Sequence, residues 1–243
     1  MSYQAPLKDM RFVIIELAGL EEVAKLPGYE DATSDTVDAI LEQASKFASE
    51  VLDPINHIGD QEGSVWRDGA VKTPKGFKEA YQQYVEGGWG ALPFDAAVGG
   101  QGLPKLVATA VEEMLTSSNM SFSLCPLLTQ GAIHALELCG SDALKDTYLA
   151  KMIQGSWTGT MNLTEPQAGS DLALVRSRAV PQGDHYKISG QKIFITYGEH
   201  DLSENIVHLV LARTPQAPEG VKGISLFLAV SYTHLTLPTI LLV

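Results

Sequence analysis

The spacing of apolar residues changes its period once along the chain, near Gly155. Before this point, apolar residues recur every three or four positions, as on the buried face of an amphipathic helix. After it, apolar and polar residues alternate, which is typical of strands with one buried face. The change predicts an α+β protein in which an all-α N-terminal domain is followed by an antiparallel β domain.

The helical part opens with residues 1–33, an N-terminal extension in which residues 12–20 could form a short helix. Thr33 or Ser34 can cap the next helix, which Pro54 is expected to stop. Pro104 suits a first helical turn, and Gly140 suits a helix end. The predicted helices cover residues 37–51, 75–86, 104–115, 126–139 and 141–152.

The β part is divided by turn-forming residues into short segments. Pro181-Gln182-Gly183-Asp184 predicts a hairpin turn between two of them. The predicted strands cover residues 156–163, 174–180, 185–189, 192–196, 206–211 and 224–228.

Composition narrows the class of protein. The 243 residues are 45% hydrophobic and 19% charged, which suits a globular protein with a substantial core. The net charge of −12 disfavours non-specific binding to nucleic acid or to anionic lipid. Cys125 and Cys139 form no disulfide or metal pattern, and the apolar run at 12–20 is too short to span a membrane. These features indicate a cytoplasmic protein.

Two features that could suggest ligand chemistry have simpler structural explanations. The glycine-rich loop of residues 88–103 lacks the Lys-Ser/Thr pair of a P-loop, so we interpret it as a turn-rich connection. His134 has Glu137 one helical turn later, but a metal site needs further ligands from elsewhere. We therefore expect a packed or solvent-facing histidine.

The segment from Gly159 to Asp171, GTMNLTEPQAGSD, contains a strand followed by a loop. Pro166 ends the strand because proline lacks a backbone donor. In the loop, Gly169 lets backbone approach a ligand, and Ser170 and Asp171 can bond nearby N–H groups or an anion. Taken alone, this tripeptide indicates only a turn.

A second segment, SGQKIFITYG from Ser189 to Gly198, lies downstream of the first. Together, in this order and at this spacing, the two segments resemble the flavin-contacting elements of the acyl-CoA dehydrogenase family. The resemblance extends over roughly residues 34–229. It implies a helical N-terminal domain at 34–156 and a partial, barrel-like middle β domain at 157–230. Residues 3–12 are similar to the extension of a subgroup of large acyl-CoA dehydrogenases that includes 3-methylmercaptopropionyl-CoA dehydrogenases.

The resemblance implies FAD as cofactor and assigns roles by position. Met161, Leu163 and Thr164 match the strand that contacts the isoalloxazine ring. Phe194 matches the aromatic residue that covers one ring face, and Thr196 matches the donor toward the N5/O4 edge. Position 161 is often aromatic in the family and position 194 is often Trp, so the electronic surroundings of the ring differ here. Without the family match, β-propensity would place Phe194 in a strand core.

Gly169 and Ser170 match positions near the thioester or pantetheine of an acyl-CoA substrate. We interpret Asp171 as fixing the turn and Glu165, which precedes Pro166, as structural. No catalytic residue is assigned, because the family's base is a glutamate in a C-terminal helical bundle beyond this chain. We therefore expect a fragment that is inactive alone and binds FAD weakly. The full-length enzyme is expected to be a homo-oligomer that passes electrons to an electron-transfer flavoprotein.

Other functions stay open at this point. An acyl-CoA oxidase shares the architecture, and a non-catalytic binding protein, such as a DNA-associated relative, could use the same fold; the acidic charge argues against DNA. The chain could also be an inactive gene product. Residues 231–243 do not continue the family pattern, and residues 230–235 read like a translated sequencing adapter. We expect this tail to be non-native, the alternative being a genuine apolar strand.

Overall fold

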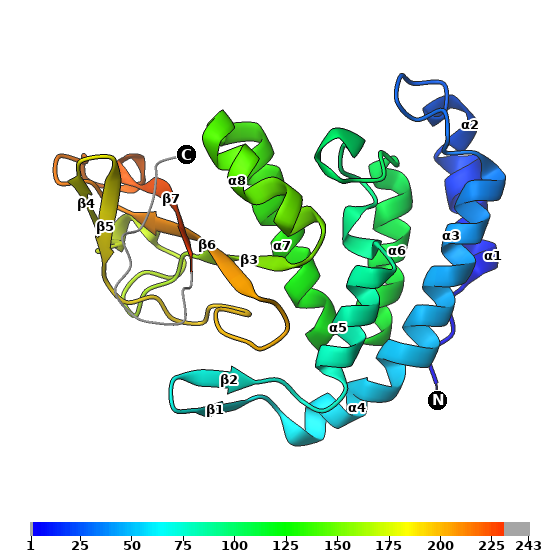
Figure 1. Ribbon diagram of the computed structural model, residues 1–243, viewed down its shortest axis with the longest axis horizontal. Helices are drawn as coiled ribbons and strands as arrows, with labels where there is room; N and C mark the ends of the chain where they lie inside the picture. The colour runs from blue at the N-terminus through cyan, green and yellow to red at the C-terminus, as the bar shows by residue number, and fades with distance from the viewer. Residues whose placement is uncertain (1, 231–243) are drawn as a thin grey trace. The chain divides into compact units, whose positions relative to one another are not determined.

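The computed structural model describes residues 2–230, so the tail at 231–243 lies outside the described residues. The described chain divides into two compact units. The first comprises residues 2–127, 153–155 and 200–202, and the second comprises residues 128–152, 156–199 and 203–230. Helices account for most of the first unit, and the second unit holds the main sheet (Figure 1). The α+β class predicted from the sequence is confirmed.

The N-terminal extension is helical from an earlier point than predicted. It forms α1 (Leu7–Phe12), a π-helical turn η1 (Val13–Leu17) and α2 (Leu20–Val23). Arg11 ties the extension to the next helix, because its guanidinium donates to Asp38 and Glu42 over 2.8 Å each. Met10, Ile14 and Leu20 are buried, which explains why the segment folds although its period is weak.

The first long helix continues through Pro54, contrary to prediction. α3 (Ser34–Lys46) is capped by Thr33, whose hydroxyl accepts from the Thr36 N–H. A π-helical turn, η2 (Phe47–Leu52), then leads into α4 (Asp53–Glu62). Pro54 is the second residue of α4 and follows the π-helical turn η2 closely. A π-type turn changes the backbone hydrogen-bond pattern locally, so the helical path can pass a proline, which lacks an N–H.

A small hairpin makes the N-terminal part less than all-α. Its strands are β1 (Val65–Arg67) and β2 (Ala70–Lys72), paired antiparallel. Asp68 and Gly69 form the turn with φ of 53° and 86°. Such positive angles are typical of a type I′ turn, and the Asp-Gly pair was its missed signal in the sequence.

The remaining helices of this part agree with prediction, with one shift. α5 (Phe77–Glu86) and α6 (Lys105–Ser118) are linked by the turn-rich loop, which holds η3 (Trp89–Ala91) and η4 (Ala96–Val98). α7 (Met120–Cys139) begins before the predicted residue 126, and α8 (Asp142–Ile153) follows it. The Asn119 side chain accepts from the Phe122 N–H over 3.0 Å and so caps α7, which places Pro126 inside the helix.

The main sheet has the order β3-β6-β7, formed by β3 (Trp157–Asn162), β6 (Asn205–Ala212) and β7 (Ser225–Val230). β6 and β7 are antiparallel, but β3 and β6 are parallel, which corrects the prediction of a purely antiparallel domain. A parallel pair requires a long crossover, and residues 163–204 provide it. The described strands form separate sheets and do not close into a barrel.

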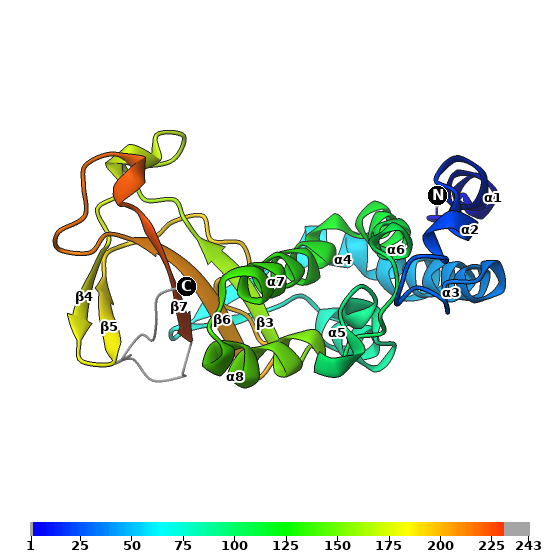
Figure 2. The same cartoon turned by 90° about the horizontal axis from the view of Figure 1, so that it is seen from above.

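The crossover contains the hairpin of β4 (Arg178–Gln182) and β5 (His185–Ser189), a separate two-stranded sheet (Figure 2). The predicted hairpin turn is confirmed. The strand predicted at 174–180 begins only at Arg178, after the 3-10 turn η5 (Leu172–Leu174). The strand predicted at 192–196 is wrong, because this segment is irregular and Phe194 and Tyr197 have φ of 57° and 52°. Left-handed backbone angles cannot continue a strand.

Candidate functional site

β3 packs tightly on the helices of its unit through Gly159. A Cβ at this position would lie 2.6 Å from the Ala132 Cβ and 2.8 Å from the Met152 Cε. The Gly159 N–H donates to the Thr129 Oγ1 over 3.0 Å and therefore points away from β6. Because backbone groups alternate along a strand, the Met161 N–H points to the same edge. β3 is the terminal strand of the described sheet, so its outer edge presents backbone donors at Met161.

The two sequence segments that resemble flavin-contacting elements lie side by side. The Thr160 hydroxyl donates to the Thr196 carbonyl over 2.6 Å. The Ile193 N–H donates to the Thr164 carbonyl over 2.9 Å. The backbones that carry Thr164 and Thr196 are thus joined at two points. That both threonine hydroxyls face one ligand stays a prediction.

Phe194 projects away from the protein, with 88% of its surface exposed. This excludes the strand core that β-propensity would favour. Its left-handed backbone angle, φ 57°, is uncommon for a large residue and turns the ring outward at the middle of the segment. Met161, Leu163 and Thr164 are partly exposed, so the residues predicted to contact a flavin remain accessible.

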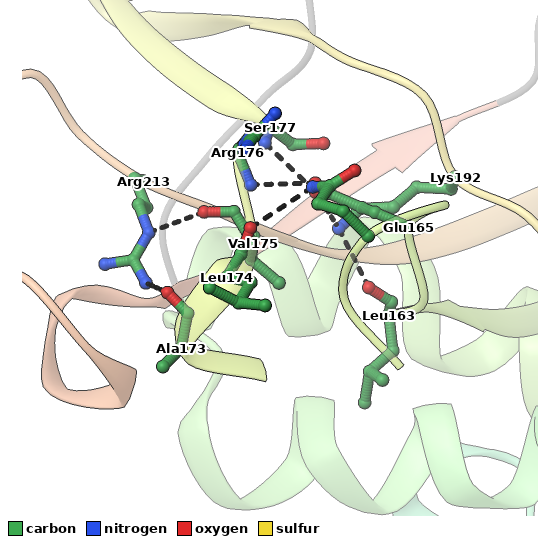
Figure 3. Close-up of polar contacts among 10 residues, drawn as sticks. Leu163, Glu165, Ala173, Leu174, Val175, Arg176, Ser177, Lys192 and Arg213 are labelled. Atoms are coloured by element: carbon green, nitrogen blue, oxygen red, sulfur yellow. Dashed lines mark hydrogen bonds and ion pairs between the residues drawn. The ribbon is translucent and has the colours of Figure 1, made fainter. Parts of the chain in front are cut away.

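Glu165 is the most heavily bonded carboxylate near these segments (Figure 3). Its side chain is 3% exposed, and its oxygens accept from Lys192 Nζ over 2.8 Å and from the N–H groups of Arg176 and Ser177 over 2.7 and 3.0 Å. Burial raises the pKa of Glu165, but the bonds from Lys192, Ser177 and Arg176 outweigh burial and lower it to about 2. Glu165 is therefore ionised and fully engaged, in agreement with the structural role predicted for it.

Lys192 extends the same network to Leu163, the residue that directly follows β3. Its Nζ also donates to the Leu163 carbonyl over 3.0 Å, and its side chain is only 10% exposed. The sequence placed Lys192 inside the second segment without giving it a role. Only the fold shows that it joins the two segments.

Arg213 is a residue that the sequence did not single out. Its guanidinium donates to the carbonyls of Val175 and Ala173 over 2.7 and 2.9 Å (Figure 3). It also donates to Pro218 over 3.1 Å and to Gly220 over 2.8 Å. Its position directly after β6 was the sole signal in the sequence, and it carries no motif.

In the Gly169-Ser170-Asp171 loop, all three residues are exposed. Asp171 accepts from the Ala173 N–H over 3.0 Å and caps η5, which confirms its predicted role in the turn. A Cβ at Gly169 would meet only the Thr164 Cγ2, at 3.9 Å, within the 4 Å that surround it. The backbone here is therefore open to approach from outside.

Comparisons with known proteins identify the family of this chain. Residues 34–156 match the acyl-CoA dehydrogenase N-terminal domain, and residues 160–235 match the acyl-CoA dehydrogenase middle domain. The chain therefore belongs to the acyl-CoA dehydrogenase family, as the sequence segments indicated.

A similar protein is the 3-methylmercaptopropionyl-CoA dehydrogenase of Ruegeria pomeroyi, which is 57% identical over 93% of this chain and 39% of its own length. Among solved structures, a chain from the electron transferring flavoprotein structure of Acidaminococcus fermentans has a TM-score of 0.67 at 28% identity, covering 80% of this chain and 47% of that chain. The FAD complex of PigA has a TM-score of 0.64 at 27% identity, covering 81% and 48%. The chain thus spans about two-fifths of the length of the Ruegeria relative.

None of the helices within residues 2–230 combines the length and apolar character that a membrane crossing requires.

Proposed function

We propose that this chain forms the flavin-binding and thioester-facing part of an FAD-dependent acyl-CoA dehydrogenase, which introduces an α,β double bond into an acyl-CoA. The observation that carries the proposal is the pair of bonds, Thr160 to Thr196 and Ile193 to Thr164, that holds both flavin-type segments together. Family membership supplies the class of reaction, and the FAD complex of PigA is a relative in fold that holds this cofactor.

The residues present fit a planar, hydrogen-bonding cofactor. The outer edge of β3 offers the Met161 N–H, and the threonines at 164 and 196 offer hydroxyl groups. Phe194, exposed at 88%, can cover one face of a flat ring, since an aromatic side chain contributes most when it is shielded from water. Bound FAD would supply a hydride acceptor. The protein's part is to orient the ring and to keep water from it.

The Gly169-Ser170 loop would hold the thioester end of the substrate. Ser170 is exposed and can donate from its hydroxyl, while Gly169 has no side chain to obstruct approach. With a net charge of −12, the chain gives no long-range attraction to the phosphates of coenzyme A, so local donors must bind it. The Ruegeria relative supports a sulfur-containing short acyl-CoA as the substrate of the whole protein.

No carboxylate of these segments is available as the proton acceptor, since Glu165 is committed to its bonds and Asp171 to a turn. The family resemblance implies a glutamate base in a C-terminal helical bundle. We therefore propose that the base lies outside this chain, and we expect the chain alone to be inactive and to bind FAD weakly. An electron-transfer flavoprotein as partner, a homo-oligomeric assembly and a cytoplasmic location complete the proposal. The free cysteines Cys125 and Cys139 suit the last of these.

The test uses the purified chain and the longer protein that carries it. We expect the longer protein, loaded with FAD, to reduce an artificial electron acceptor with a short-chain acyl-CoA, and the chain alone to do so at background rate. Peroxide formation in air by the longer protein would instead indicate an oxidase. Turnover by the chain alone would show that its base lies within the 243 residues.

A further inference from the structure

Two charged side chains bind the backbone of residues 173–177, one through its N–H groups and the other through its carbonyls. Glu165 accepts from the N–H groups of Arg176 and Ser177, and Arg213 donates to the carbonyls of Ala173 and Val175 (Figure 3). Two donors and two acceptors of this segment are therefore satisfied by a side-chain carboxylate and a guanidinium. This segment directly follows the exposed loop at Gly169 and Ser170.

The same carboxylate is bound to the other predicted ligand segment. Lys192 Nζ bridges Glu165 and the Leu163 carbonyl, over 2.8 and 3.0 Å. The residue after Lys192, Ile193, donates to the Thr164 carbonyl. Glu165 is thus the point at which the loop after Gly169 and the segment that carries Phe194 and Thr196 are tied to each other.

This network is a costly way to obtain stability alone. Buried ion pairs pay a desolvation penalty that often cancels their attraction, and apolar residues of similar size would serve a core as well. The Glu165 and Lys192 side chains are 3% and 10% exposed. Buried charged groups form short, directional hydrogen bonds, which can hold a backbone segment in one position.

We propose that Glu165, Lys192 and Arg213 are positioning residues that fix the Gly169–Ser170 loop relative to the Phe194–Thr196 segment, and so fix an acyl thioester relative to a flavin. The proposal rests on the proposed function and extends it. Lys192 acts on both segments. Arg213 acts on the thioester-facing side alone, because its bonds go to Ala173, Val175, Pro218 and Gly220.

The experiment uses the longer, FAD-loaded protein and the variants Lys192→Met, Lys192→Arg and Arg213→Met, with Lys187→Met as matched control. Lys187 is an exposed lysine of β5 in the same unit. The readouts are the Kd for FAD from flavin fluorescence, the visible circular dichroism of bound flavin, KM and kcat. Deuterium exchange of residues 169–177 is measured on the apoprotein.

We expect Lys192→Met to weaken FAD binding about tenfold or more, to change the flavin dichroism and to speed exchange at 169–177. Arg213→Met should raise KM for acyl-CoA about tenfold and leave the Kd for FAD within about twofold. Lys192→Arg should recover most of the FAD affinity, because arginine keeps the charge and the donors. Lys187→Met should change none of the readouts.

Should Lys192→Met fail to fold, the double variant Glu165→Gln with Lys192→Met replaces it, because that pair leaves no unmatched buried charge. A folded Lys192→Met variant, single or combined with Glu165→Gln, that keeps wild-type FAD affinity, dichroism and exchange would overturn the inference. A wild-type protein that does not bind FAD would instead overturn the proposed function, so the two failures are distinguishable.

Discussion

The hydroxyl of Thr160 donates to the backbone carbonyl of Thr196 over 2.6 Å. This bond joins the interior of β3 to an irregular segment 36 residues later, and Thr160 is only 1% exposed. A buried side-chain donor that bonds a loop carbonyl holds the loop at a defined distance from the strand. The bond therefore sets where the predicted flavin-contacting residues of the two segments meet.

Replacing Thr160 by valine removes the donor and keeps the shape of the side chain. We expect a loss of about 0.5–1.5 kcal/mol in the free energy of unfolding, because one part-buried intramolecular hydrogen bond is removed. Urea denaturation measures this loss. Thr160→Ser keeps the hydroxyl and should be affected less. An unchanged unfolding midpoint for Thr160→Val would show that the bond does not contribute to stability.

A substitution at Phe194 should separate the predicted FAD binding from stability. Since its side chain is 88% exposed, Phe194→Ala should change the free energy of unfolding of the apoprotein by no more than about 0.5 kcal/mol. FAD binding by the longer protein should weaken about tenfold, because the ring loses an aromatic cover. Fluorescence titration gives the affinity, with Phe194→Trp as the control that retains it. Equal affinity of the alanine variant and the wild type would remove Phe194 from the site.

Two glycines of the segment from Gly159 to Asp171 should respond differently to replacement by alanine. Gly159→Ala places a methyl group 2.6 Å from the Ala132 Cβ and 2.8 Å from the Met152 Cε, so we expect about 1–3 kcal/mol of destabilisation. Gly169→Ala meets only the Thr164 Cγ2 at 3.9 Å and should leave stability unchanged. The exposed Gly169 variant should raise KM for acyl-CoA in the longer protein. Thermal unfolding and steady-state kinetics measure the two effects, and a reversed order would contradict the assignment.

The Glu165 carboxylate should make stability depend on acid pH. Its pKa falls from 4.5 in a free side chain to about 2 in the fold, so its ionised form stabilises the protein above pH 4.5 and this contribution is lost between pH 4.5 and 2. The full contribution is of the order of 3 kcal/mol. Urea unfolding at several pH values tests this. Glu165→Gln should be less stable than the wild type near neutral pH, and this difference in the free energy of unfolding should shrink between pH 4.5 and 2. Glu204 is exposed, so Glu204→Gln should show the same pH dependence as the wild type.

His208 should make stability depend on pH in a higher range than Glu165 does. Burial lowers its pKa from 6.5 to about 4, so the unfolded chain binds a proton more readily than the folded one. Stability is therefore expected to fall by the order of 3 kcal/mol as pH drops from 6.5 to 4. NMR titration of the ring should show the low pKa. His208→Gln should flatten this part of the profile, and replacing the exposed His57 by glutamine should not.

The sequence alone determined the features that depend on neighbouring residues. Apolar spacing and caps such as Thr33 located the main helices, and turn residues such as Gly183 located a hairpin, because these signals act within a few positions of the chain. The family also followed from the sequence, since the residues of each of the two segments that indicated it are adjacent in the chain. The structural roles of Glu165 and Asp171 were also predicted, because each could be inferred from its neighbours in the sequence.

Only the tertiary structure decided which distant residues meet. The parallel pairing of β3 and β6, the irregular path that exposes Phe194 and the bonds from Arg213 to the carbonyls of Ala173 and Val175 all depend on partners far away in the chain. β-propensity favoured a strand at 192–196, but the backbone of this segment forms hydrogen bonds with Thr160 and Thr164 instead of with a strand partner. Local preference is worth about 1 kcal/mol or less per residue, so a few buried hydrogen bonds from distant residues outweigh it.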